Sequence, residues 1–431
     1  DEKAKDSLYV QGEKLFKAIV DRSHQLGLKI ILDVNLNHTS PAYRGQDYVA
    51  NVTEYDLQDG AIFEDGKFIA ARSGYFEKIF GIKNTQANWF HKYPSIVWDT
   101  KQRNSLREVY KKMGYDLVGD EPNAFEKENF MLHNLADLNQ NNKNVFKYVL
   151  GAMSKWTRTG VDGFRIDAVR HIPQDFFIKI KKRLTSINPK LFFIGEWFES
   201  GVNNKESLKF ASKSGALLFD FEKMKQIRDL YIKEDIDYSG LKKILERSGN
   251  FINFIENQDI PRVLSVKHFD NELYEEMIKL LFVLEGVPSL YYGTEQYLHN
   301  DSYKNNRTSF GQIGGDPWNR DYMDWDISGY KEKPIYLMIK KLAKLRQDSN
   351  CLRDGATRLI PTDNSILAFE RVLGNEKFLY LSSRTETSIT TMTSFPDGIY
   401  YDKITEVKYE IKGHQLQTQL MPFKAIILST N

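Results

Sequence analysis

The sequence predicts a parallel α/β fold, a (β/α)8 TIM barrel, with an inserted subdomain and a C-terminal all-β domain. Short, continuous apolar runs alternate with segments of helical periodicity over much of the chain. Towards the C-terminus this pattern changes to short β-like runs separated by turns. A chain of 431 residues is also too long for one ordinary core, so two or three domains are expected.

The barrel elements follow one another in order. The opening stretch is expected to be a helix, because apolar residues recur at helical spacing from Leu15 to Val20 and Gly27 is a suitable stop. Two further helices are expected near 145–160 and 274–286. The apolar runs that predict buried parallel strands are 28–34, 161–167, 191–196, 216–221, 250–256 and 287–292.

These runs make only six strands, whereas a closed barrel of this kind has eight. Either two N-terminal strands are missing from this chain, or the strand count is two short. In the first case a separate N-terminal polypeptide could complete the barrel.

The domain boundaries follow from changes in the pattern. Residues 1–38 and 135–345 form the predicted barrel. Residues 39–134 are long, polar and irregular, which is typical of an inserted subdomain rather than a loop. Residues 346–431 are predicted to form a C-terminal β-sandwich domain.

The composition excludes several classes of protein. A net charge of +2 gives no strong field, so neither nucleic acid nor an anionic membrane surface is an expected partner. The single cysteine, Cys351, excludes an intrachain disulfide and a thiolate metal site, and a core role is expected for it. No run of 18 apolar residues suggests a membrane span, and the polar start shows no signal peptide.

Acidic residues stand at the C-terminal ends of predicted strands, where barrel active sites are built. Asp33, Asp167 and Glu196 end three different strands, and Asp259 follows another. Arg165 is two residues before Asp167, so both side chains should leave the same face and the guanidinium should hold Asp167 ionised. Aromatic residues flank Glu196, and an apolar collar would raise the pKa of this carboxyl and make it a proton donor.

One charged and one protonated carboxyl is the division of labour of a retaining glycosidase. An aspartate at a strand end is nevertheless often a cap or loop anchor, and Arg165 with Asp167 could be a structural ion pair. The pattern of residues leaves both alternatives open.

Six motifs in order resemble the α-amylase family, glycoside hydrolase family 13. The similarity runs from about Gly12 to the end, and is greatest to the cyclodextrin glucanotransferase and maltogenic amylase group. The motifs are DVNLNH (33–38), LADLN (135–139), GVDGFRIDAVRH (160–171), FIGEW (193–197), FIENQD (254–259) and GVPSLYYGTEQ (286–296).

The resemblance implies a role for each matched acid. Asp167 would be the nucleophile that forms a glucosyl-enzyme ester. Glu196 would protonate the leaving oxygen and then activate the incoming water or sugar hydroxyl. Asp259 would bind hydroxyls of the sugar at the cleavage subsite and favour its distorted form.

The resemblance also implies substrate-binding and metal-binding residues. The expected substrate-binding residues are His38, Arg165, Arg170, His171, Phe198, Gln258, Asp316 and Arg320. A calcium ion would be held by Asn37, Asp137 and the backbone carbonyl of His171, because mixed oxygen ligands suit this cation. The alternative is an Asn–Asp hydrogen bond with no metal.

Two positions depart from the pattern. Gln258 stands where the family usually has His, and Gln can donate to a sugar hydroxyl but cannot become cationic. His133 stands where cyclising relatives usually have Tyr or Phe, which favours hydrolysis or transfer to linear acceptors.

The resemblance therefore implies a retaining hydrolase of α-1,4-glucosidic bonds in starch-derived oligosaccharides. Two alternatives are a glucanotransferase and a catalytically silent family member that acts as a binding subunit. Calcium and a polymeric substrate imply an extracellular or periplasmic location.

Overall fold

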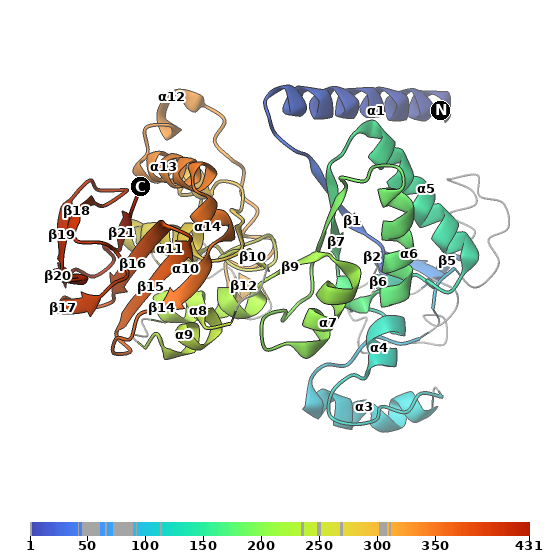
Figure 1. The fold of residues 1–431 in the computed structure, drawn as a ribbon. Coiled ribbons are helices and arrows are strands. Elements are labelled where there is room, and N and C mark those ends of the chain that lie inside the picture. Colours follow the sequence, from blue (N-terminus) through green and yellow to red (C-terminus); the bar gives the residue numbers. More distant parts are fainter. Residues whose placement is uncertain are drawn as a thin grey trace. The chain divides into compact units, whose positions relative to one another are not determined.

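The protein forms two compact units, seen in a computed structural model (Figure 1). Unit 1 comprises residues 1–198 and 209–216, and unit 2 comprises residues 199–208 and 217–431. The structure describes residues 2–41, 43–44, 61–64, 67–71, 89–91, 93–112, 114–133, 135–233, 237–247, 251–267, 270–300, 308–309 and 312–431. Much of the predicted inserted subdomain therefore lies outside the described residues.

Unit 1 contains both helices and strands. Its helices are α1 (Glu2–Gln25), α3 (Thr100–Lys112), α4 (Ala124–Asn129), α5 (Lys143–Thr159), η2 (Val169–His171), α6 (Gln174–Thr185) and the second part of α7 (Lys205–Ser214). Its strands are β1 (Ile31–Asn35), β2 (His38–Pro41), β3 (Tyr43–Arg44), β4 (Ala61–Glu64), β5 (Lys67–Ala71), β6 (Leu135–Asp137), β7 (Gly163–Asp167) and β8 (Phe192–Gly195).

Unit 2 begins with helices and parallel strands and ends in antiparallel sheets. Its helices are α8 (Phe221–Ile232), α9 (Ser239–Leu245), α10 (Val263–Val266), α11 (Asn271–Val283), η3 (Thr294–Gln296), α12 (Ile327–Tyr330), α13 (Pro334–Asp348) and α14 (Asn350–Asp354). Its first strands are β9 (Leu217–Phe219), β10 (Phe251–Asn253), β11 (Val287–Pro288), β12 (Thr308–Ser309) and β13 (Gln312–Ile313). The C-terminal strands are β14 (Ala356–Leu359), β15 (Ile366–Leu373), β16 (Glu376–Ser383), β17 (Thr387–Met392), β18 (Gly398–Tyr401), β19 (Lys408–Lys412), β20 (Gln415–Leu420) and β21 (Ile426–Ser429).

The six predicted parallel strands are all present. In unit 1, β7 pairs in parallel with β1 and with β8. In unit 2, β10 pairs in parallel with β9 and with β11. The predicted burial of the first strand is wrong, because Ile31 is 38% exposed and β1 pairs with β7 alone among the described parts of the chain.

The expected opening helix is α1, and its contacts explain why it lies where it does. Phe16 packs edge-on against Trp156 of α5, with ring centroids 5.2 Å apart, and Val20 is fully buried. Gly27 follows the helix with a φ of 76°, a left-handed conformation that favours glycine. In the part of the chain that the structure describes, no helix has the length and apolar character needed to cross a membrane.

The described part of 39–134 has a small core of its own. Five buried side chains form it, namely Ile96, Val97, Tyr110, Leu117 and Phe130. Beside them, the buried Arg103 and Glu126 form a two-pronged ion pair, with N–O distances of 2.6 and 2.7 Å. This ion pair joins α3 to α4, so the two helices are held together by a buried charge pair as well as by the apolar core.

The C-terminal region is all-β, as predicted, and consists of two four-stranded antiparallel sheets. The first sheet has the order β14-β15-β16-β21 and the second has the order β17-β20-β19-β18. Side chains alternate along the first sheet. Ala368 and Leu379 belong to the core shared with the second sheet, whereas Phe369 and Tyr380 belong to the core that contains the side chains of α11 and α13.

A buried carboxylate of α11 adds polar contacts between this helix and the first C-terminal sheet. Glu276 is fully buried and accepts hydrogen bonds from the hydroxyls of Tyr380 (3.2 Å) and Ser382 (2.6 Å) on β16. It also accepts one from the backbone N–H of Ala425 at 3.0 Å. Helix α11 and the first C-terminal sheet therefore share both an apolar and a polar interface.

Candidate active site

Two neighbouring parallel strands of unit 1 carry the first group of charged side chains. The register of β1 and β7 places Asp33 opposite Arg165 and Asn35 opposite Asp167. Arg165 Nη1 donates hydrogen bonds of 2.8 Å to Asp33 Oδ1 and to Asp167 Oδ1. The predicted pairing of Arg165 with Asp167 is therefore confirmed.

The third partner of this arginine is Glu196, which follows β8. Arg165 Nη2 lies 2.7 Å from Glu196 Oε1, and the Glu196 side chain is only 13% exposed. Burial by itself would lower the pKa of Arg165, but Glu196, Asp33 and Asp167 together raise it. One guanidinium thus holds two of the predicted catalytic carboxylates beside one another.

The Glu196 carboxylate has a charged neighbour that the expected apolar collar does not include. Trp197 is buried and packs against Phe210, with ring centroids 5.4 Å apart, and Phe198 is 58% exposed. The near neighbour of the Glu196 carboxylate is instead the Arg165 guanidinium.

Asn35 is a site residue that the sequence reasoning missed. Its Nδ2 donates to Asp167 Oδ2 at 2.8 Å and lies 2.6 Å from His38 Nε2. Its Oδ1 accepts hydrogen bonds from the backbone N–H groups of Asn37 (2.8 Å) and His38 (2.9 Å). The available signal was its position two residues after Asp33, which puts both side chains on the same face of β1.

Both ring nitrogens of His38 lie near side-chain amides. Nε2 is 2.6 Å from Asn35 Nδ2, and Nδ1 is 3.4 Å from Asn37 Nδ2. Burial lowers the pKa of His38, while Asp167, whose Oδ2 is 3.9 Å from Nε2, opposes this shift. The expected substrate-binding histidine therefore lies beside Asp167.

The predicted calcium ligands lie in a buried part of unit 1. Strands β2 and β6 pair His38 with Asp137, and Asn37 and Asp137 are both almost completely buried. Among the described residues, Asn37 Oδ1 and Asp137 Oδ1 have no hydrogen-bond partner. Burial raises the pKa of Asp137 to about 7, although His91 and Asn37 oppose this shift.

This donor set fits a hard cation. The structure brings no three His, Cys, Asp or Glu side chains together within its described ranges. The proposed set instead contains one carboxylate, one amide oxygen and one backbone carbonyl, and calcium accepts this mixture of oxygens. Asn37 Oδ1 and Asp137 Oδ1 are buried without a hydrogen-bond partner, and a bound cation would satisfy both oxygens, which are otherwise costly to bury.

Two of the expected substrate-binding residues, Arg170 and His171, pack against Trp98, which sequence reasoning did not place in the site. The Arg170 guanidinium lies 5.0 Å from the centroid of the Trp98 ring. The His171 ring meets the same indole edge-on, with centroids 5.9 Å apart. His171 Nδ1 donates to the Lys127 carbonyl at 2.8 Å, and burial lowers the pKa of His171 to about 4.

His133 is exposed and has a left-handed φ of 57°.

Unit 2 carries the remaining predicted site residues as a second group. Gln258 Nε2 donates to Asp259 Oδ2 at 2.8 Å, and Asn257 Oδ1 accepts from the backbone N–H of Asp259 at 2.9 Å. Arg320 Nε lies 2.7 Å from Asp316 Oδ1, and Arg320 Nη2 lies 3.8 Å from Asp259 Oδ1. Two expected substrate-binding residues, Asp316 and Arg320, therefore form an ion pair, and the same arginine lies near Asp259.

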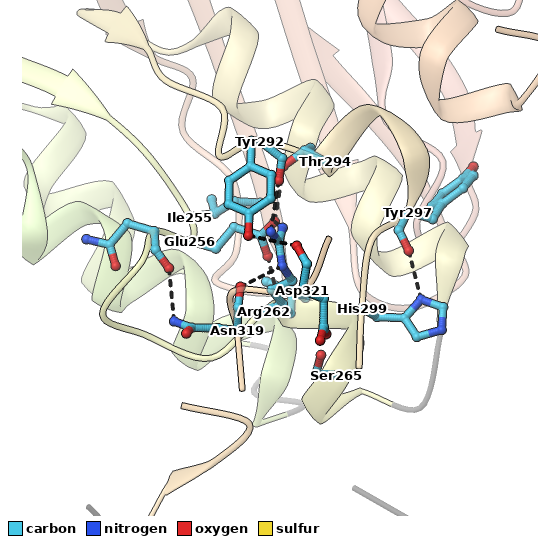
Figure 2. A network of polar contacts seen from close by, with 12 residues as sticks. Ile255, Glu256, Arg262, Ser265, Tyr292, Thr294, Tyr297, His299, Asn319 and Asp321 are labelled. Atoms are coloured by element: carbon cyan, nitrogen blue, oxygen red, sulfur yellow. Dashed lines mark hydrogen bonds and ion pairs between the residues drawn. The ribbon is translucent and has the colours of Figure 1, made fainter. Parts of the chain in front are cut away.

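A buried polar network supports this second group (Figure 2). Glu256 accepts hydrogen bonds from Tyr274 Oη (2.5 Å), Thr294 Oγ1 (3.1 Å) and the backbone N–H of Val263 (2.9 Å). Arg262 is fully buried, donates from Nη2 to the Tyr292 carbonyl at 2.9 Å, and has its Nη1 3.6 Å from Glu256 Oε1. Sequence reasoning missed this network, since nothing in the local sequence shows that Glu256 and Arg262 are buried together.

The predicted site residues thus fall into two groups, each joined by direct contacts. In unit 1, Arg165 links Asp167 to Glu196, and Asn35 links Asp167 to His38. In unit 2, Asp259 contacts Gln258 and Arg320.

Comparison with known proteins places these groups in a family. Residues 11–355 match the model of the α-amylase catalytic domain. The chain belongs to the α-amylase family, and its fold is of the (β/α)8-barrel class with a C-terminal all-β region.

Individual relatives agree with this assignment. The chain is 30% identical to a cyclomaltodextrin glucanotransferase of Bacillus sp. (strain 38-2) over 400 residues, which are 90% of this chain and 48% of that protein. It is 29% identical over 402 residues to the corresponding protein of Thermoanaerobacterium thermosulfurigenes. The chain therefore spans about half the length of the curated relatives it matches.

Solved structures give the same result. CldA, a cyclomaltodextrin glucanotransferase with a three-domain ABC distribution, matches with a TM-score of 0.75 and 27% identity, over 97% of this chain and 78% of CldA. The α-amylase of Geobacillus thermoleovorans shares the fold, with a TM-score of 0.69 and 20% identity, over 96% of this chain and 79% of that one. Neither the structure nor these relatives support a separate N-terminal polypeptide.

Proposed function

We propose that the chain is a retaining glycoside hydrolase that cleaves α-1,4-glucosidic bonds in starch-derived oligosaccharides. The observation that carries this proposal is the shared guanidinium of Arg165, which lies 2.8 Å from Asp167 Oδ1 and 2.7 Å from Glu196 Oε1. A retaining mechanism needs two carboxyl groups close to one another, one as nucleophile and one as acid and base. Membership of the α-amylase family supports the same assignment.

In the first step, Asp167 attacks the anomeric carbon, and the bond from that carbon to the leaving oxygen breaks. Glu196 gives its proton to this oxygen. In the second step Glu196 takes a proton from water, the water oxygen bonds to the anomeric carbon, and the Asp167 ester is released. Hydrogen bonds from Arg165 and Asn35 hold the two oxygens of Asp167.

The ion pair with Arg165 bears on how Glu196 becomes an acid. Arg165 also contacts Asp33 and Asp167, so it keeps two partners if Glu196 moves away. We infer that bound substrate separates Glu196 from Arg165, and that the carboxyl then takes up its proton. Arg165 remains beside Asp167 throughout.

Asp259 is proposed to bind hydroxyl groups of the sugar at the cleavage subsite, with Gln258 at its side. Gln258 Nε2 already donates one hydrogen bond to Asp259, and an amide has a second N–H for a sugar hydroxyl. Arg320 and Asp316 are proposed to bind the donor chain, and Arg170, His171 and Phe198 the acceptor. Phe198 is the hydrophobic side chain of this set, and it is exposed.

A calcium ion is proposed as a structural cofactor, held by Asn37 Oδ1, Asp137 Oδ1 and the backbone carbonyl of His171. Bound calcium would supply positive charge to the buried Asp137 carboxylate and join β2 to β6. It takes no part in the bond-breaking step. The family and its proposed polymeric substrate also support an extracellular or periplasmic location.

A glucanotransferase is the second candidate. It is favoured by the curated relatives, which are named cyclomaltodextrin glucanotransferases, and by the exposed ring of Phe198, which could hold an acceptor sugar. Both activities use the same first step, so they differ in whether water or a sugar hydroxyl attacks the ester.

The test is product analysis on maltoheptaose, with and without added glucose. Hydrolysis is expected to give short linear products whose first-formed anomer is α by NMR. Products of the opposite anomeric form would refute the retaining mechanism, and new longer or cyclic products would favour the transferase. Loss of turnover by at least about 10³-fold is expected in Asp167→Ala, and trapping by a 5-fluoroglycosyl fluoride should label Asp167 in the wild type alone.

A further inference from the structure

A reciprocal set of hydrogen bonds joins two distant segments of unit 2, residues 257–262 and 319–320. Asn319 is fully buried, and its Nδ2 donates to the carbonyls of Gln258 and Ile260, both at 2.8 Å, with a longer contact of 3.3 Å to Asn257 O. In return, Arg262 Nε donates to the Asn319 carbonyl at 3.1 Å. Figure 2 shows Asn319 and Arg262 in this network.

The carbonyls that Asn319 holds lie directly before and after Asp259. The backbone N–H of Asp259 is held separately, by Asn257 Oδ1 at 2.9 Å. The peptide unit before Asp259 is thus fixed through the Gln258 carbonyl and the Asp259 N–H, and the unit after it through the Ile260 N–H, which donates to Asn257 Oδ1 at 3.2 Å. The Asp259 side chain is itself 48% exposed. Because the Asp259 carboxylate is exposed, the direction in which it points depends on these backbone hydrogen bonds.

Asn319 also precedes Arg320, which contacts both Asp316 and Asp259. The same residue therefore sets the position of Asp259 and the position of the arginine 3.8 Å from it. Misplacing a group of this kind by about 1 Å can cost 10²-fold in rate.

We propose that Asn319 is a positioning residue for Asp259. Its hydrogen bonds to the backbone on either side of Asp259 hold this residue at a fixed distance from Arg320. This inference rests on the proposed role of Asp259 in the reaction. Asn319 acts through the backbone and is not assigned a contact with substrate.

The base of the loop has an anchor of its own, so the chain is expected to fold without the Asn319 side chain. Glu256 accepts from the Val263 N–H at 2.9 Å and from Tyr274 Oη at 2.5 Å, and Arg262 donates to the Tyr292 carbonyl at 2.9 Å. These bonds do not involve Asn319. Its removal should free the segment around Asp259 and leave these bonds of Glu256 and Arg262 in place.

The test compares Asn319→Ala with Gln296→Ala in the 431-residue chain. Gln296 is a matched control, because it is also a buried amide that holds a backbone segment. Its Oε1 accepts from the Asp324 N–H at 3.1 Å, and its Nε2 donates to the Asp324 carbonyl at 2.8 Å. Asn319→Ala is expected to lower kcat on maltoheptaose by about 30- to 100-fold with KM changed less than about threefold. Gln296→Ala should lose similar thermal stability and keep kcat.

A double-mutant cycle with Asp259→Asn identifies the route of the effect. With an activated maltosyl fluoride as substrate, adding Asn319→Ala to Asp259→Asn should change the rate by less than about threefold. The same factor in both backgrounds, or a kcat for Asn319→Ala equal to that of Gln296→Ala, would overturn the inference. If Asn319→Ala does not fold, Asn319→Ser, which keeps one donor, replaces it under the same criteria.

Failure of the proposed function gives a different result. Wild-type turnover in Asp259→Asn would remove Asp259 from the reaction, and with it both proposals. An inactive Asp259→Asn together with a fully active Asn319→Ala would overturn the positioning role alone.

Discussion

Removal of calcium should make the stability of the protein depend on pH through Asp137. Burial raises the pKa of this carboxyl from 3.8 to about 7, so the folded metal-free protein binds more protons than the unfolded chain between these values. Stability must therefore fall as the pH rises through this window. His91 Nδ1, 2.6 Å from Asp137 Oδ2, and Asn37 oppose the shift and limit its size.

The size of the effect follows from the two pKa values. One pKa unit corresponds to about 1.4 kcal/mol, and integration between pH 5 and pH 8 gives a loss of about 3 kcal/mol for the metal-free protein. For a unit of this size, that corresponds to a decrease of roughly 5 to 10 °C in the melting temperature. Calcium bound to the ionised carboxylate should offset this loss.

The assay is calorimetry of the transition that unfolds unit 1, at pH 5 and pH 8, with excess EDTA or with calcium. Calcium is expected to stabilise the protein more at pH 8 than at pH 5. In Asp137→Asn, both the pH dependence and the response to calcium should largely disappear. Equal melting temperatures with EDTA and calcium at pH 8 in the wild type would refute the calcium site. A calcium response preserved in Asp137→Asn would refute its assignment to Asp137.

Three further substitutions give separate tests. Arg165→Lys should lower kcat by about 10²-fold or more, since an ammonium cannot reproduce the guanidinium geometry that holds Asp167 beside Asp33, and a kcat near wild type would contradict the role of Arg165 in holding Asp167. Gln258→His should alter KM and the pH profile by adding a titratable group, whereas an unchanged rate and profile would make this departure from the family inconsequential. Glu126→Ala should lower the free energy of unfolding by about 3–5 kcal/mol in denaturant titrations, because its buried arginine partner loses its counter-charge; a change below about 1 kcal/mol would show that the charge is compensated elsewhere.

Periodicity was enough to find the parallel strands and the opening helix, because each depends on local apolar spacing. Burial of β1 was mispredicted, since an apolar run reports the tendency to be buried and not which neighbours cover it. The antiparallel C-terminal region was predictable from its short alternating runs. The pairing of those strands into two sheets depends on contacts between distant residues, which no local pattern encodes.

The pairing of Arg165 with Asp167 was predictable because both residues lie on one strand. The contact between Arg165 and Glu196 depends on two different strands, and the aromatic neighbours of Glu196 in sequence gave no sign of this charged partner. Asn319 lies 60 residues after Asp259 in the sequence, and its role depends entirely on the folding of the loops that carry them. Such residues become visible only when hydrogen-bond partners are known.

The first C-terminal sheet has a consequence for how this chain could be shortened or recombined. One face of this sheet covers α11 and α13, and the other covers the second sheet, so it is an inner layer of unit 2 rather than an attached module. Deleting it would expose the apolar side of α11 to water and leave the carboxylate of Glu276 without the Tyr380, Ser382 and Ala425 donors. A shortened enzyme or a chimaera should therefore keep the segment from α11 to β21 from a single parent.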